Sequence, residues 1–202
     1  MSALLALALA LAACSGEAPA PPSAETASAE TALAAPSPEA SPVPAPVPAA
    51  DVPESDPAGP ETWTTAPLVG KGAGSHARVK DVRAATHEGF DRIVLEFERE
   101  SAPEYRLVYL AAPLANCASG APAEVEGGGV LQVQLMGTSG HDDAGAATTP
   151  KEVRPALPVV REIERVCDFE GVVAFAVGVK APTPFRAFTL TAPARLVVDV
   201  RR

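Results

Sequence analysis

The sequence predicts an all-β fold: a single β-sandwich of roughly eight short strands, preceded by a disordered stalk. Several stretches of residues 71–202 alternate apolar and polar residues with the period of two that half-buried strands show. Segments rich in Gly and Pro separate these stretches at regular intervals, as turns do in sandwiches. No stretch of this part sustains a helical period over four turns, because Pro155 and Pro158 break the only contender, around Val159–Glu164.

Composition divides the chain into residues 1–13, 14–70 and 71–202. The first 70 residues are mostly Ala, Pro, Ser, Glu and Thr, and they carry eight acids with no Lys or Arg. The other 17 acids face all 16 bases, so most of the net charge of −9 belongs to the N-terminal part. Residues 71–202 are numerous enough for a core of their own. Since they show no basic stripe, we do not expect binding to nucleic acid.

Residues 1–13 are expected to be a lipoprotein signal peptide. Ala3–Ala13 is an unbroken apolar run of 11 residues, which is too short to span a bilayer but typical of an export signal. It ends in small residues directly before Cys14, a pattern that resembles the lipobox of bacterial lipoproteins. The resemblance implies that Cys14 is diacylated and begins the mature chain, and two acyl chains anchor a protein stably to a membrane. The alternative is an apolar run that meets a cysteine by chance, and the Pro-rich segment that follows argues against it.

Residues 15 to about 62 are expected to form an unfolded stalk. They contain almost no large apolar side chains, so nothing offsets the entropy of ordering them. Pro-rich chains favour the extended polyproline II conformation, which would hold the domain away from the membrane. Trp63 lies at the junction, where we expect it to pack against the edge of the domain; stacking on a sugar is the alternative.

Within residues 71–202, the clearest strand is Phe90–Glu98, where Ile93, Leu95 and Phe97 share one face. Tyr105–Leu110 alternates in the same way. The expected strands are His76–Arg83, Phe90–Glu98, Tyr105–Leu110, Val130–Leu135, Ile163–Phe169, Val172–Val179, Phe185–Leu190 and Leu196–Arg201.

Cys117 and Cys167 are expected to form a disulfide, since the lipid would occupy the third cysteine and an even pair would remain in a secreted domain. The alternative is two free thiols or a metal pair. It is the weaker one, because the two residues are far apart in the sequence and neither has a His neighbour.

Two stretches of the domain, His87–Phe97 and Gly171–Val200, are specific enough to suggest a family. The first contains Gly89-Phe90-Asp91-Arg92, and the second ends in Pro193-Ala194-Arg195-Leu196-Val197-Val198-Asp199-Val200. Together they resemble the AMIN-like domain of actinobacterial lipoproteins, which is related to the AMIN domain that accompanies cell-wall amidases and secretins. The resemblance covers most of Ser75–Arg202. It implies a β-sandwich that binds peptidoglycan and does not catalyse a reaction.

Arginine suits such a ligand, because its planar fork binds carboxylates through two parallel hydrogen bonds. Arg92, Arg186 and Arg195 are therefore candidate ligand contacts. The alternative is structural: Asp91-Arg92 and Arg195…Asp199 could pair across neighbouring strands, which would contribute little if the pairing were exposed.

No enzyme, metal or cofactor is expected. A hydrolase needs an activated nucleophile or a metal, and the sequence contains no G-x-S-x-G, HExxH or Cys-His arrangement. His141-Asp142-Asp143 lies in the Gly-rich loop 137–145 and could hold a cation weakly, but a solvated polar loop is the simpler interpretation.

The sequence thus predicts a lipid-anchored, extracytoplasmic lipoprotein whose domain binds cell-wall polymer. The main alternative is a module that docks a secreted enzyme or an envelope complex through a sheet edge or an exposed face. A third reading is a small-ligand carrier, which would need a deep enclosed pocket.

Overall fold

The computed structural model of the protein describes residues 59–73, 76–98 and 100–202. These residues form an all-β fold, and they contain no helix that could span a membrane. The expected signal peptide, Cys14 and most of the expected stalk lie outside the described residues.

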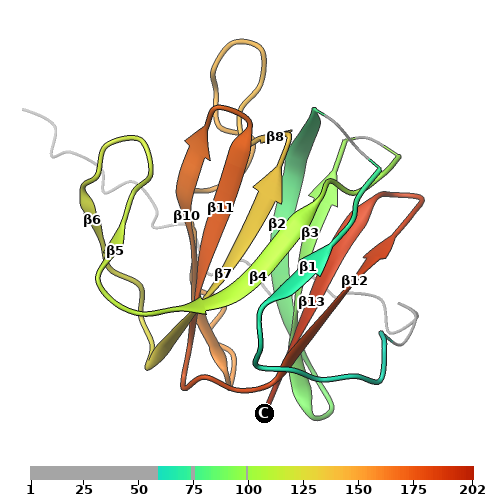
Figure 1. Ribbon diagram of the computed structural model, residues 1–202, viewed down its shortest axis with the longest axis vertical. Coiled ribbons are helices and arrows are strands. Elements are labelled where there is room, and N and C mark those ends of the chain that lie inside the picture. The colour runs from blue at the N-terminus through green and yellow to red at the C-terminus, as the bar shows by residue number, and fades with distance from the viewer. Residues whose placement is uncertain (1–58, 74–75, 99) are drawn as a thin grey trace, which may run out of the picture. The chain divides into compact units, whose positions relative to one another are not determined.

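Two main sheets, both drawn in Figure 1, make up the domain. The six-stranded sheet has the order β1 (Leu68–Gly70), β4 (Tyr105–Leu110), β7 (Gly129–Met136), β11 (Val172–Val179), β10 (Val160–Phe169) and β9 (Glu152–Val153). The five-stranded sheet has the order β12 (Phe185–Leu190), β13 (Arg195–Arg201), β3 (Phe90–Phe97), β2 (Ala77–His87) and β8 (Thr138–Ser139). A small hairpin joins β5 (Leu114–Ala115) and β6 (Pro122–Ala123).

The core lies between the two sheets, as the alternation in the sequence predicts. Ile93, Leu95 and Phe97 of β3 are each at most 2 % exposed and belong to one buried cluster with residues of the other sheet. The members from β4, β7 and β11 are Tyr105, Leu107, Leu131, Val133, Leu135, Val173, Phe175, Val177 and Val179. The all-β sandwich predicted from the sequence is therefore confirmed.

All eight expected strands are present, and Tyr105–Leu110, Val172–Val179 and Phe185–Leu190 have the expected bounds. Val159–Glu164, the only contender for a helix, lies almost wholly within strand β10. The sequence reading missed five strands, β1, β5, β6, β8 and β9, which have only two or three residues each. Such short segments do not contain enough residues to show a period.

The fold includes residues upstream of position 71, where composition placed the start of the domain. β1 pairs antiparallel with β4, with Leu68 opposite Leu107. Thr64 exchanges two backbone hydrogen bonds with Phe185, at 2.9 and 2.8 Å. These residues join the sheets through backbone hydrogen bonds, and Leu68 packs against the core. So few apolar residues do not change the local composition, which is why composition alone assigns them to the stalk.

A second, smaller core lies on the six-stranded sheet. Ala174 and Ala176 of β11 pack with Val166 of β10 and with Ala123 of the β5–β6 hairpin. The predicted disulfide between Cys117 and Cys167 is confirmed and ties this hairpin to β10, with sulfur atoms 2.03 Å apart. The hairpin therefore covers small apolar side chains that would otherwise face solvent.

The two tyrosines of the chain give a pH-dependent signature of the fold. Burial raises the pKa of Tyr105 above its ordinary value of 10.0. Burial also raises the pKa of Tyr109, against an opposing hydrogen bond that the Thr183 N–H donates to its phenol oxygen at 3.1 Å. A raised folded pKa contributes stability that is fully present below the unfolded pKa and is lost as pH rises through the folded pKa.

We therefore expect phenolate absorbance to appear at higher pH in the folded protein than in the denatured protein, together with alkaline unfolding. Parallel absorbance titrations in buffer and in denaturant, followed by circular dichroism, measure this. Coincident titration curves with an intact fold would contradict it.

Candidate functional site

The two family-like stretches lie side by side in the five-stranded sheet. β3 and β13 pair antiparallel, with Arg92 opposite Asp199. β12 pairs with the other edge of β13, with Arg186 opposite Asp199. The strand order therefore places one carboxylate between two guanidinium groups (Figure 1, strands β12, β13 and β3).

Asp199 is the centre of this cluster and is 0 % exposed. Arg92, which is 3 % exposed, donates from Nε to Asp199 Oδ1 at 2.7 Å and from Nη2 to Oδ2 at 3.0 Å. Arg186 Nε adds a third bond to Oδ2 at 2.8 Å. Two aromatic rings flank the Arg92 guanidinium, Phe90 at 5.3 Å and Phe188 at 5.5 Å. The carboxylate is thus fully used within the protein.

Trp63 packs on the domain beside this cluster, as expected for a residue at the junction. The Arg186 guanidinium lies 4.5 Å from the centre of the indole, and that of Arg201 lies 5.2 Å from it. The Phe90 ring is tilted against Trp63, with centroids 6.0 Å apart. Both arginines lie within the range in which a cation is attracted to an aromatic face.

The same end of the sheet carries a second buried carboxylate, Asp91. Its Oδ2 accepts hydrogen bonds from the backbone N–H groups of Val159 and Val160, at 2.7 and 3.0 Å. Thr86 donates to its Oδ1 at 3.0 Å, and Arg202 Nε lies 3.7 Å away. Asp91 therefore holds the start of β10 against β3, which the sequence did not reveal.

The turn between β2 and β3 contains a glycine in the left-handed region of backbone conformation. Gly89 has a φ of +83°, and its carbonyl oxygen accepts a hydrogen bond from the Arg202 N–H at 3.0 Å. The Arg202 side chain also donates to Thr86 Oγ1 at 2.7 Å and to the His87 carbonyl oxygen. The C-terminal residue is thus fastened to this turn.

The structure does not bring the three candidate arginines together. Arg92 is buried in its pair with Asp199, which argues for a structural role and against contact with a polymer. Arg186 is half-buried in the same cluster. Arg195 lies at the other end of β13, opposite Glu96, and donates to the Pro193 carbonyl oxygen at 3.4 Å.

Arg201 is the residue that the sequence reading missed. It is exposed, it contacts Trp63, and it forms no ion pair within the part of the chain that the structure describes. Two exposed acids, Glu61 near Trp63 and Glu88 in the β2–β3 turn, form no ion pair with Arg201 either. The only signal in the sequence was its place at the end of the last strand, beside Arg202.

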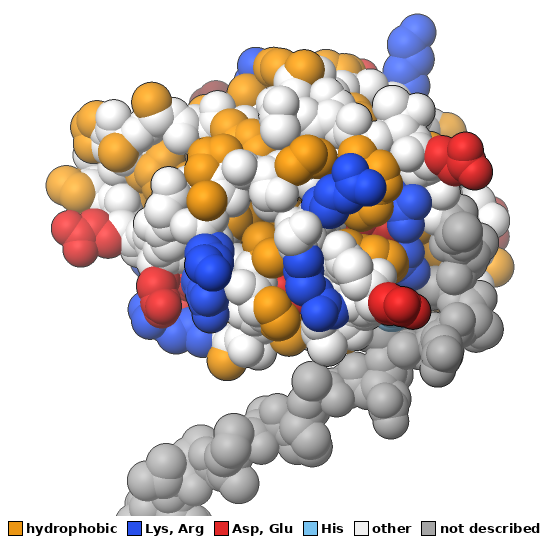
Figure 2. Space-filling model, turned by 90° about the horizontal axis from the view of Figure 1, so that it is seen from below, with side chains coloured by type: hydrophobic (Ala, Val, Ile, Leu, Met, Phe, Trp, Pro, Cys, Tyr) orange, Lys and Arg blue, Asp and Glu red, His pale blue; other side chains and the backbone are white. Residues whose placement is uncertain are grey.

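We call Trp63, Phe90, Arg186, Arg201 and Arg202 the basic–aromatic face. It lies at the end of the domain where the chain ends, which Figure 2 shows from below. Lys and Arg side chains are distributed there among apolar side chains, with acidic groups between them. Since the charges are mixed, recognition on this face depends on where hydrogen-bond donors point rather than on a strong overall field.

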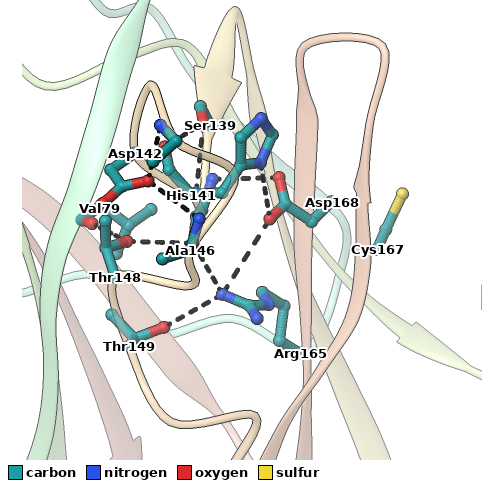
Figure 3. A network of polar contacts seen from close by, with 12 residues as sticks. Val79, Ser139, His141, Asp142, Ala146, Thr148, Thr149, Arg165, Cys167 and Asp168 are labelled. Carbon is teal, nitrogen blue, oxygen red and sulfur yellow. Dashed lines mark hydrogen bonds and ion pairs between the residues drawn. The ribbon is translucent and has the colours of Figure 1, made fainter.

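A second polar network, shown in Figure 3, holds the loop around His141 at the opposite end of the sheets. His141 Nδ1 lies 3.1 Å from Asp168 Oδ2, and the Gly140 N–H donates to Asp168 Oδ1 at 3.0 Å. Arg165 donates to the Gly140 carbonyl oxygen at 2.9 Å, and Thr148 donates to the Val79 carbonyl oxygen at 2.6 Å. The loop is thus tied to both sheets.

This network contains Ser, His and Asp but lacks the geometry of a catalytic triad. Ser139 donates to the backbone carbonyl oxygen of His141 at 2.7 Å and accepts from its N–H at 3.2 Å, so its hydroxyl does not bond the imidazole. Asp142 Oδ1 accepts two backbone N–H groups of its own loop. Among the described residues, no group of three or more potential metal ligands is present.

The polar cleft beside this loop is open rather than enclosed. Within it, Arg78 is paired with Glu98 at 3.2 Å and with Asp143 at 2.6 Å, so these charges satisfy one another. The cleft does not have the enclosure that a small-ligand carrier needs.

Comparison with known proteins identifies the family. The model of the AMIN-like domain matches residues 77–202, which include β3, β12, β13 and the Asp199 cluster. The match begins after Trp63 and β1, so part of the basic–aromatic face lies outside it. No curated protein and no solved structure matches the chain. With more than half of its length matched and both motif strands paired, the chain belongs to the AMIN-like domain family.

Proposed function

We propose that this protein is a non-catalytic envelope lipoprotein that binds peptidoglycan through its basic–aromatic face. Membership of the AMIN-like family supports a binding or docking module in general. The Cys117–Cys167 disulfide fits an extracytoplasmic location, because disulfides persist in oxidising compartments. In this proposal a lipid on Cys14 holds the chain at the membrane, and the residues between Cys14 and the domain give it reach into the wall.

The observation that carries the proposal is the exposed Arg201 guanidinium beside Trp63. Its N–H donors have no carboxylate partner within the described ranges, whereas the neighbouring carboxylates of Asp91 and Asp199 are buried and bonded. Peptidoglycan offers carboxylates and hydroxyls, and both accept hydrogen bonds from a guanidinium. Arg201 therefore replaces Arg92 as the main candidate contact, and Arg186 supports it.

Co-sedimentation with isolated peptidoglycan tests this proposal. The full chain carrying Cys14→Ser is used, so that a lipid cannot cause pelleting. We expect saturable binding that Arg201→Ala weakens by about tenfold or more, because a hydrogen bond to a charged group contributes about 1.5–3 kcal/mol.

Arg106→Ala is the matched control for this experiment. Arg106 is also exposed and lies on β4 of the other sheet. Its replacement by Ala removes the same charge as Arg201→Ala does. Pelleting no greater than that of an unrelated protein would remove the proposed function. An equal loss with both variants would show nonspecific charge attraction instead.

Docking to a protein is the second candidate function, and a different surface favours it. Phe169 of β10 is 51 % exposed and Met136 of β7 is 39 % exposed, and both lie opposite Val172 of β11. Crosslinking on intact cells with and without Phe169→Ser tests this surface, because a partner docked there is lost with the ring.

A further inference from the structure

We propose that the group recognised on the basic–aromatic face is a free carboxylate of the wall peptides, and that Trp63 positions Arg201 to bind it. This inference rests on the proposed function and names the chemical class of the ligand. It also assigns part of the site to residues 59–64, which precede the region that the family model matches.

Most guanidinium groups of this face are already bonded within the protein and are not available to a ligand. Arg92 is bound to Asp199 through two nitrogens. Arg186 is bound to Asp199 and to the Pro60 carbonyl oxygen at 3.1 Å. Arg202 is bound to Thr86 and to the backbone at His87. Among the described arginines of this face, only Arg201 keeps its full set of side-chain donors.

The groups around Trp63 favour one kind of ligand acceptor. The Trp63 ring has guanidinium groups at 4.5 and 5.2 Å and the Phe90 ring at 6.0 Å. These guanidinium groups lie over the indole, where a sugar would otherwise stack. What the face offers instead is a planar set of N–H donors beside a ring, and that fork matches a carboxylate in two parallel bonds.

Contacts on both sides of Trp63 in the chain hold this residue in position. Residues 59–64 are held at one end by the two backbone bonds between Thr64 and Phe185. At the other end, Arg186 bonds to Pro60, and Gly59 lies so close to Phe188 that a Cβ at position 59 would overlap the ring. The segment is thus fixed on both sides of the indole. Arg201, stacked on that ring, loses less conformational entropy when it binds a ligand.

Chemically modified peptidoglycan tests the inference separately from the proposed function. Phosphate-bearing polymers are first removed from the sacculi, so that phosphate cannot account for binding. One half of the preparation then has its carboxyl groups converted to amides. The Cys14→Ser chain is expected to bind the amidated sacculi about tenfold more weakly or worse than the untreated sacculi, since each lost charged partner costs at least that factor.

Equal binding to both preparations would overturn the carboxylate inference and leave the proposed function intact. Absence of binding to the untreated sacculi would overturn both. Arg201→Lys separates a bidentate contact from simple charge, because Lys keeps the charge but lacks the planar fork. The same loss is expected for Arg201→Lys with untreated sacculi, and no loss for the matched control Arg106→Lys.

The single tryptophan of the chain reports directly on the site. We expect its fluorescence to change in a saturable way with a soluble wall pentapeptide that ends in a free carboxylate. The C-terminal amide of the same peptide, and the Arg201→Lys variant with either peptide, are expected to give no change. A response to the amide equal to that of the acid would contradict a carboxylate site.

Discussion

Replacing Asp199 by Ala is expected to destabilise the domain by about 3–5 kcal/mol, the range measured when one partner of a buried ion pair is removed. Asp199 is fully buried, and its two oxygens accept three hydrogen bonds from Arg92 and Arg186. Without it, the buried Arg92 guanidinium keeps its charge but has no carboxylate to bond. The change in free energy of unfolding is measured by urea denaturation of the full chain, with the slope checked for constancy.

Two comparisons make this prediction specific. Asp143→Ala removes a carboxylate that is 97 % exposed and pairs with Arg78 at the surface, so it should cost about 1 kcal/mol or less. The double variant Arg92→Met with Asp199→Leu removes both buried charges and should recover much of the lost stability. If Asp199→Ala costs no more than Asp143→Ala, the buried cluster is not the structural centre that its geometry indicates.

The sequence predicted the long strands because alternate residues of each face the core between the sheets over several residue pairs. In β3, burial of Ile93, Leu95 and Phe97 imposes the alternation that is visible in the residues. β5, β6, β8 and β9 have two residues each and each pairs with a single strand, so they are too short to show an alternation in the sequence. β1 was missed for the same reason, since its three residues, which pair with β4, are too few to show an alternation.

The candidate site was predicted only in part, because register decides which charges meet. The sequence suggested pairing across neighbouring strands for Asp91-Arg92 and Arg195…Asp199. The strands do pair, and Arg92 bonds to Asp199 as suggested, whereas Arg195 lies opposite Glu96. Asp91 bonds mainly to the backbone of β10, a contact that no local pattern can indicate.

Burial is the reason that we propose Arg201 rather than Arg92 as a ligand contact. Arg92 stands in the most recognisable motif of the chain, and that motif encodes the internal pair with Asp199. Arg201 has no motif of its own. Its side chain becomes a candidate ligand contact only in the folded domain, where Trp63, 138 positions earlier in the sequence, lies beside it. Residues that stabilise the fold through internal contacts are thus easier to identify in a sequence than residues that the folded domain exposes to a ligand.

Loss of the Cys117–Cys167 disulfide is the second large effect that we expect. The bond closes a loop with a sequence separation of 50, for which the chain-entropy relation gives about 4 kcal/mol. The double variant Cys117→Ala with Cys167→Ala should therefore lower the urea midpoint markedly. The urea slope should rise, because an unfolded chain without the crosslink exposes more surface.

The position of the disulfide makes the effect selective. The β5–β6 hairpin covers Ala174 and Ala176 of the six-stranded sheet, whereas the basic–aromatic face belongs to the five-stranded sheet and residues 59–64. At low temperature and without urea, where the variant is still folded, its pelleting with peptidoglycan should equal that of the parent chain. A variant that is folded by circular dichroism yet no longer binds would place the ligand on the hairpin side of the domain. Equal binding with reduced stability would assign the disulfide to the scaffold and keep the site at Trp63 and Arg201.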